Sequence, residues 1–161
     1  VYSYPFRQYY KASRTRSDQF LPKTNLEQVL ALYRFDERLR ATTFQELSRI
    51  EVGLRALIGY TLGKDHPYLH LASLRLGPSG FDKENNHETD EYRKWIKAYN
   101  INLSRSQEDF IKHYKKEYAS KLPIWVAVHI LEWGQLAMLF KMAPIHCQDS
   151  IADSLHLSGS S

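Results

Sequence analysis

The chain has 161 residues, of which 43% are hydrophobic, and its formal net charge is +4. This length predicts one domain with a sizeable core, and the mild positive charge permits an RNA or DNA partner without requiring one. We expect no membrane span, because no run reaches the roughly 18 apolar residues that a spanning helix needs. The single cysteine, Cys147, rules out an intramolecular disulfide and predicts a reducing cytoplasm.

Residues 1–23 are basic and aromatic and have no clear period. We expect an irregular arm, which would either contact nucleic acid or serve as a solvated connector. The chain opens without Met and closes with LHLSGSS just after a helical pattern. We therefore expect residues 1–161 to form a single helical domain that is incomplete at both ends.

A long helix is predicted over residues 24–62. Thr24 and Glu27 fit a capping box, apolar residues follow at helical spacing, and no proline interrupts the segment. The pattern fits one long helix, or two helices with a bend at residues 41–43. Gly63 is the expected stop.

The rest of the chain predicts further helices separated by loops. Residues 63–90 are rich in loop residues, and 78–89 are expected to be a surface loop. Helices are predicted over about 90–99, 104–118, 123–142 and 148–157. The strongly apolar segment 123–142 should be central in the core, with Gly134 allowing close helix–helix approach. The predicted fold class is all-α: a helical bundle with one or two long central helices.

Charged residues interrupt the apolar face of the first long helix. At about 100° per residue, Asp36 lies in the middle of the apolar arc, with Arg40 and Glu51 close to it. Arg55 lies at the edge of the arc, while Arg49 points the other way. Two i,i+4 pairs result, Asp36/Arg40 and Glu51/Arg55. They form either a structural ion network or a charged cleft, in which the arginines hold a phosphate that Glu51 orients.

Other constellations carry less information. His66 and His70 have a metal-compatible spacing, but Pro67 separates them, and we expect neither a metal nor a cofactor. His113 lies among lysines, so it either contacts RNA or covers a helix face. Residues 150–158 resemble the start of a helix-turn-helix, which gives DNA binding as a further alternative.

Four segments carry a resemblance to a known family: LYRFDERLR (32–40), RIEVGLRALIGY (49–60), EDFIKHYKKEY (108–118) and LPIWVAVHILEWGQLAMLF (122–140). Together they resemble the Abi-like (abortive infection, phage-resistance) proteins, which are grouped with HEPN-type helical domains. The resemblance covers about residues 20–157. In the last segment Pro123, Trp125 and Gly134 match, and His129 stands where an acid is common.

The resemblance implies phage defence or toxin action through RNA binding or metal-independent RNA cleavage. HEPN-type chemistry uses an arginine and a histidine with four to six residues between them, and no histidine stands at that distance after Arg55. The family's RNxxxH-like motif follows the point where this chain ends. Whether the chain is an enzyme therefore stays open, with Arg55 and Glu51 as catalytic candidates. The binding or supporting candidates are Asp36, Arg40, Arg49 and His113.

The partners implied are RNA, a second copy of the chain or another protein. The alternative to RNA chemistry is a non-catalytic interaction module, either a dimer or one partner of a toxin–antitoxin pair. The many tyrosines favour such a surface, because a tyrosine ring combines an apolar body with a polar tip.

Overall fold

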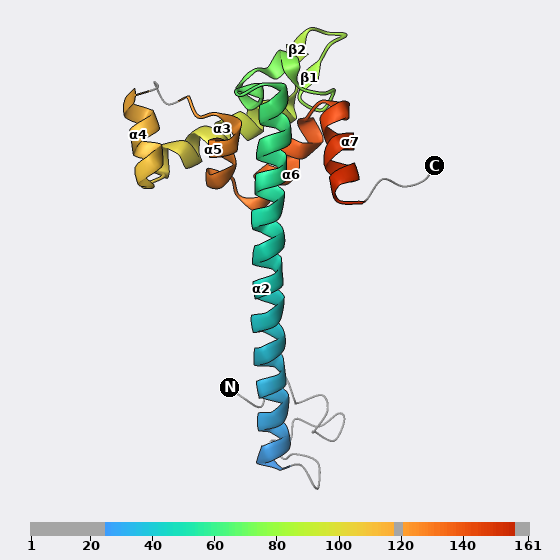
Figure 1. Cartoon of the computed structure of the whole chain (residues 1–161), viewed down its shortest axis with the longest axis vertical. Coiled ribbons are helices and arrows are strands. Elements are labelled where there is room, and N and C mark those ends of the chain that lie inside the picture. Colours follow the sequence, from blue (N-terminus) through green and yellow to red (C-terminus); the bar gives the residue numbers. More distant parts are fainter. Residues whose placement is uncertain (1–24, 118–120, 157–161) are drawn as a thin grey trace, which may run out of the picture. The chain divides into compact units, whose positions relative to one another are not determined.

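A computed structural model describes residues 25–117 and 121–156 (Figure 1). The chain divides into two compact units, residues 1–49 and residues 50–161. The described elements are α2 (Leu26–Asp65), the 3-10 turns η1 (Leu69–Leu71) and η2 (Ser73–Arg75), strands β1 (Phe81–Asp82) and β2 (His87–Glu88), α3 (Asp90–Arg105), α4 (Asp109–Glu117), α5 (Ile124–Ala127), η3 (Val128–Ile130), α6 (Trp133–Met142) and α7 (Ile145–Ser154). The all-α prediction is confirmed. The predicted arm, 1–23, lies outside the described residues.

Helix α2 is a single helix without a bend at residues 41–43 (Figure 1). At its start, the Asn25 side chain accepts a hydrogen bond from the backbone N–H of Gln28 at 2.8 Å. The predicted cap, Thr24, lies outside the described residues. Gly63 does not end the helix as predicted, because α2 continues to Asp65. Pro67 provides the stop, since the residue before a proline is disfavoured in the helical conformation.

In the first unit, the described part of α2 exposes many of its apolar side chains. Eight large apolar side chains in the described part of this unit are exposed: Leu26, Leu30, Leu32, Tyr33, Phe35, Leu39, Phe44 and Leu47. Apolar spacing therefore predicted the helix correctly but did not predict where its face is buried.

The second unit holds the hydrophobic core. Its buried side chains come from the end of α2, from η1, α3, α4, α5, α6 and α7. On α3, Trp95 stacks on Tyr99 with ring centroids 5.6 Å apart, and its indole N–H donates to the carbonyl of Gln135 at 2.8 Å. Asn102 donates to the carbonyl of Ile130 at 3.1 Å. These bonds fix α3 against the segment that joins η3 to α6.

Two glycines of α2 allow α5 to pack closely. A Cβ on Gly59 would lie 3.2 Å from the Cα of Trp125, and one on Gly63 would lie 2.8 Å from the Trp125 ring. By contrast, a Cβ on Gly134 would meet nothing within 4 Å. The prediction that Gly134 allows close helix approach was therefore wrong, and this role belongs to Gly59 and Gly63.

The predicted single helix over 123–142 is broken in the structure. Leu131 adopts an extended backbone, with ψ at 136°, and a new helix begins at Trp133. Glu132 and Gln135 form a reciprocal capping box at this start. The capping residues outweigh the continuous apolar pattern, because they satisfy backbone N–H groups that a helix start leaves free.

Smaller differences lie at other element ends. The predicted surface loop contains a short antiparallel hairpin, in which Phe81 pairs with Glu88. Helix α3 begins after the cap Thr89 and continues to Arg105, so no helix begins at Ser104 as predicted. Helix α7 begins three residues earlier than predicted, at Ile145. No helix among the described residues is long and apolar enough to cross a membrane.

Candidate functional site

Arg55 lies where α2 meets the break between η3 and α6. Its guanidinium donates to the backbone carbonyls of Val128 and Leu131, the second at 2.7 Å. These carbonyls end a helical segment and would otherwise lack donors, because the last carbonyls of a helix have no partner within it. Arg55 thus stabilises the broken backbone between η3 and α6.

The predicted pair between Glu51 and Arg55 is present, with Nη2 and Oε1 2.5 Å apart. The Arg55 side chain is only 16% exposed, and Glu51 balances its charge at the edge of the core. These contacts make Arg55 and Glu51 supports for the backbone around residues 128–131. A catalytic role for either residue stays a prediction.

The remaining predicted residues lie on exposed surfaces. Asp36 and Arg40 form the expected i,i+4 pair in the first unit, and Arg49 pairs with Glu46 at 2.9 Å. His113 is exposed on α4, with its ring 6.2 Å from that of Tyr114. Pairs this exposed contribute under about 1 kcal/mol, so their side chains can exchange an acidic partner for a phosphate at little cost.

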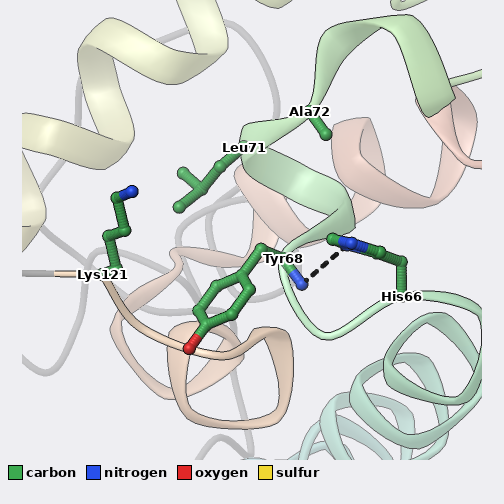
Figure 2. Close-up of a pocket in the computed structure, with 5 residues that line it drawn as sticks. All are labelled: His66, Tyr68, Leu71, Ala72 and Lys121. Atoms are coloured by element: carbon green, nitrogen blue, oxygen red, sulfur yellow. Dashed lines mark hydrogen bonds between the residues drawn. The ribbon is translucent and has the colours of Figure 1, made fainter. Parts of the chain in front are cut away.

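A cavity of about 410 Å³ lies beside the turn that follows α2 (Figure 2). His66, Tyr68, Leu71, Ala72 and Lys121 line it. The first four belong to the segment from the end of α2 through η1, whereas Lys121 comes from the segment just before α5. Two parts of the chain far apart in sequence therefore supply the lining.

Backbone hydrogen bonds fix the shape of this turn. The N–H of Ile124 donates to the carbonyl of Pro67 at 2.7 Å, which ties the turn to the start of α5. The N–H of Tyr68 donates to Nδ1 of His66 at 3.1 Å (Figure 2). Because Nδ1 accepts this bond, the neutral imidazole of His66 carries its proton on Nε2.

The cavity lining combines an imidazole, a phenol ring and an ammonium group. None of its lining residues is acidic. An aromatic ring can stack on a nucleobase, an ammonium can hold a phosphate, and an imidazole can transfer a proton. A polyanion with exposed bases matches this lining better than a cationic or purely apolar ligand does.

The family model for Abi-like proteins matches residues 1–160. The chain belongs to the Abi-like family. This membership supports a role in abortive infection or phage defence. Comparisons with curated proteins and with solved structures found no match.

The sequence of this Abi-like protein did not indicate a role for Tyr68 or Lys121, and it suggested His66 only as a metal ligand. The sequence HPY after a helix end suggests a turn, but nothing local connects it to Lys121, more than 50 residues later. The cavity becomes visible once the Pro67–Ile124 hydrogen bond is known.

His70 of this Abi-like protein does not share a site with His66. Its ring is fully buried, edge-on to Tyr99 with centroids 5.3 Å apart, and neither of its nitrogens has a hydrogen-bond partner among the residues that the structure describes. Burial lowers the pKa of His70 to about 3. The side chain is thus a neutral part of the core.

Proposed function

We propose that this Abi-like protein acts in phage defence by binding RNA in the cavity lined by His66, Tyr68 and Lys121, and by cleaving it there. The observation that carries the proposal is the meeting of an aromatic ring, a cation and an imidazole around one open cavity. Family membership supports the defence role. The single cysteine of the sequence supports action in the cytoplasm.

In this proposal Tyr68 stacks on a base and Lys121 neutralises the adjacent phosphate. His66 donates its Nε2–H to a non-bridging phosphate oxygen, while a hydroxide ion from solvent takes the proton from a ribose 2′-hydroxyl and the 2′-oxygen forms a bond to phosphorus. The bond from phosphorus to the 5′-oxygen breaks, and that oxygen takes a proton from water. The reaction needs no metal ion, because Lys121 and the Nε2–H of His66 stabilise the negative charge on the phosphate.

The residues predicted from the sequence have supporting roles in the proposal. Arg55 and Glu51 hold the backbone at residues 128–131, which precedes the capping of α6. His113 offers a further contact to RNA from α4. Arg40 and Arg49, in the first unit, offer independent contacts to a phosphate backbone.

The binding step is tested with fluorescent single-stranded RNA and anisotropy titrations at several salt concentrations. Replacing Tyr68 by Ala should weaken binding by about 5- to 150-fold, since stacking on one base contributes about 1–3 kcal/mol. Lys121→Ala should weaken binding, and it should reduce the slope of log K against log salt concentration by about 0.7, the value for one lost phosphate contact on a single strand. Lys94→Ala, an exposed lysine of α3, is the matched control. Equal affinity in all variants would contradict the cavity as the RNA site.

The cleavage step is tested by incubating the chain with total RNA in the presence of EDTA. His66→Ala should change binding little and reduce cleavage by about 100-fold or more, as expected for a lost hydrogen-bond donor to the phosphate in the transition state. His87→Ala, an exposed histidine of β2, is the control. Intact RNA with the unmodified chain would refute cleavage by these residues and leave the binding proposal to its own test.

A second candidate function, a module that binds a second copy of the chain, is favoured by the apolar face of α2 in the first unit. Leu30, Tyr33, Phe44 and Leu47 are all exposed and occupy the first and third pairs of a and d positions of one heptad register, while Glu37 and Arg40 occupy the pair between them. Four arginines and four acids lie between residues 34 and 51. Because these charges balance, the same face of a second copy meets no net repulsion.

The test is the oligomeric state of the chain by sedimentation equilibrium. A dimer that dissociates in the variant Phe44→Ser/Leu47→Ser supports this candidate, with Glu27→Ser, on the same helix, as the control. A monomer at all concentrations contradicts self-association and leaves the RNA proposal unaffected.

A further inference from the structure

A second cluster of reactive side chains lies in the second unit, where the end of α2 meets the start of α7. Asp65 is the last residue of α2, and His146 and Cys147 lie in the first turn of α7. Oδ1 of Asp65 is 3.1 Å from Nε2 of His146, and that nitrogen is 3.3 Å from Sγ of Cys147. One carboxylate, one imidazole and one thiol thus converge on one point.

This cluster has the dimensions of a metal site. Its three potential ligand atoms lie within 4.8 Å of one another. Tetrahedral zinc with ordinary bond lengths separates a nitrogen and an oxygen ligand by about 3.3 Å, and a sulfur and a nitrogen ligand by about 3.6 Å. The observed distances are a few tenths of an ångström shorter, so small side-chain shifts would admit an ion.

We propose that Asp65, His146 and Cys147 bind a zinc-type divalent metal ion, with a fourth coordination position open to the adjoining cavity. The ligand set of one thiolate, one imidazole and one carboxylate suits zinc, a borderline-soft ion, better than calcium or magnesium, which prefer oxygen. The carboxylate and the thiolate together neutralise the charge of the ion.

The adjoining cavity gives the fourth position a function. It has a volume of about 310 Å³, and Thr61, Lys64 and Ser150 line it beside the three ligands. Three protein ligands and an open position are typical of zinc sites that hold a water molecule or a substrate oxygen. The ammonium of Lys64 would favour an anionic ligand there.

The same residues do not form a cysteine nucleophile. Burial, together with the nearby Asp65 carboxylate, raises the pKa of the Cys147 thiol to about 11. Reactive cysteines have lowered pKa values instead, whereas a zinc ion displaces the proton of the thiol that binds it. The sequence did not indicate the site, because His146 and Cys147 are adjacent and Asp65 precedes them by 81 residues, a spacing that no metal motif has.

The test is direct titration of the purified full chain with Zn²⁺ under reducing conditions, together with Co²⁺ as a spectroscopic probe. We expect one zinc ion per chain and a thiolate-to-cobalt charge-transfer band. Asp65→Asn, which changes a partly exposed side chain, should reduce affinity at least about 100-fold, the upper range for residues that merely support ligands. Cys147→Ser should abolish the cobalt band, while circular dichroism confirms that each variant is folded.

His87→Gln, which removes an exposed histidine of β2, is the control and should bind zinc as the unmodified chain does. No stoichiometric zinc binding by the unmodified chain would overturn the proposal. So would unchanged affinity in Asp65→Asn together with an unchanged cobalt band in Cys147→Ser, which would place any bound ion elsewhere.

Discussion

The two ends of helix α2 show how one apolar pattern leads to two outcomes. In residues 26–49, in the first unit, Phe44 is 76% exposed and Leu47 is 56% exposed. In residues 50–65, in the second unit, Ile58 and Leu62 are buried in the core. The spacing of apolar residues is helical in both parts.

What distinguishes the second part is its glycines. Gly59 and Gly63 remove the side chains that would hold α5 away, so the backbone of Trp125 approaches within van der Waals distance. Burial therefore depends on a partner surface that can come close, and apolar spacing on α2 does not by itself reveal that partner.

The largest difference in stability is expected when a leucine is replaced by alanine in each of the two parts of α2. Leu62→Ala should lower the free energy of unfolding by about 2–5 kcal/mol, since it opens a cavity in the core. Leu47→Ala should change it by less than about 0.5 kcal/mol, as is usual on a surface. Urea denaturation measures both values. A large and concentration-dependent loss for Leu47→Ala would instead show that a second copy covers this face.

Acid should destabilise the second unit through His70. The folded-state pKa of about 3 lies below the ordinary value of 6.5, so the unfolded chain binds a proton that the folded chain refuses. Stability is unaffected above pH 6.5 and falls as the pH drops toward 3, by at most about 1.4 kcal/mol per pH unit. His70→Leu should remove this slope, and His87→Gln, at an exposed position, should retain it. Equal slopes in urea denaturation of the unmodified chain and His70→Leu would contradict the burial of His70.

Replacing an arginine should also affect stability more in the second unit, at Arg55, than in the first unit, at Arg40. Arg55→Met leaves two carbonyls and Glu51 without their donor, and we expect a loss of about 2–3 kcal/mol in unfolding free energy. Arg40→Met breaks an exposed pair and should cost less than about 0.5 kcal/mol. Thermal unfolding compares them. Equal small losses would show that Arg55 is free for another role, such as holding phosphate.

The smallest expected changes in stability come from replacing two glycines of α2, Gly53 and Gly63, by alanine, and these two changes should have opposite signs. Gly53→Ala should stabilise the chain by about 0.5–1 kcal/mol, because a Cβ there meets nothing within 4 Å and alanine favours helix. Gly63→Ala should destabilise it by about 1–3 kcal/mol through overpacking against Trp125. Melting temperatures that rise for both variants would show that α2 and α5 are not closely packed.

Much of the fold follows from the sequence, because helix periods and capping residues act locally. The all-α class, helical structure along α2 and the two i,i+4 pairs were predicted from spacing, which left open whether α2 bends at residues 41–43. The break at Leu131 was not predicted, because one of its causes is remote in sequence: Arg55 donates a hydrogen bond to the Leu131 carbonyl. Its other cause, the capping box at Glu132, lies within a run of apolar residues that by itself indicates a continuous helix.

The candidate sites were less predictable, since each joins segments far apart in the chain. His66 and Lys121 lie around one cavity, and Asp65 lies beside His146, without any sequence spacing that marks them. Arg55 and Glu51 stood out in the sequence as polar residues on an apolar face. In the structure, these two residues are polar because they support the backbone at residues 128–131.

The RNA cavity is tested most directly by phage infection of cells that express the chain or its variants at equal levels. We expect the unmodified chain and Lys94→Ala to reduce plaque formation. Tyr68→Ala and Lys121→Ala should restore plaques to the number seen without the chain. Full protection by both cavity variants would contradict the proposal that phage defence depends on RNA bound at this cavity.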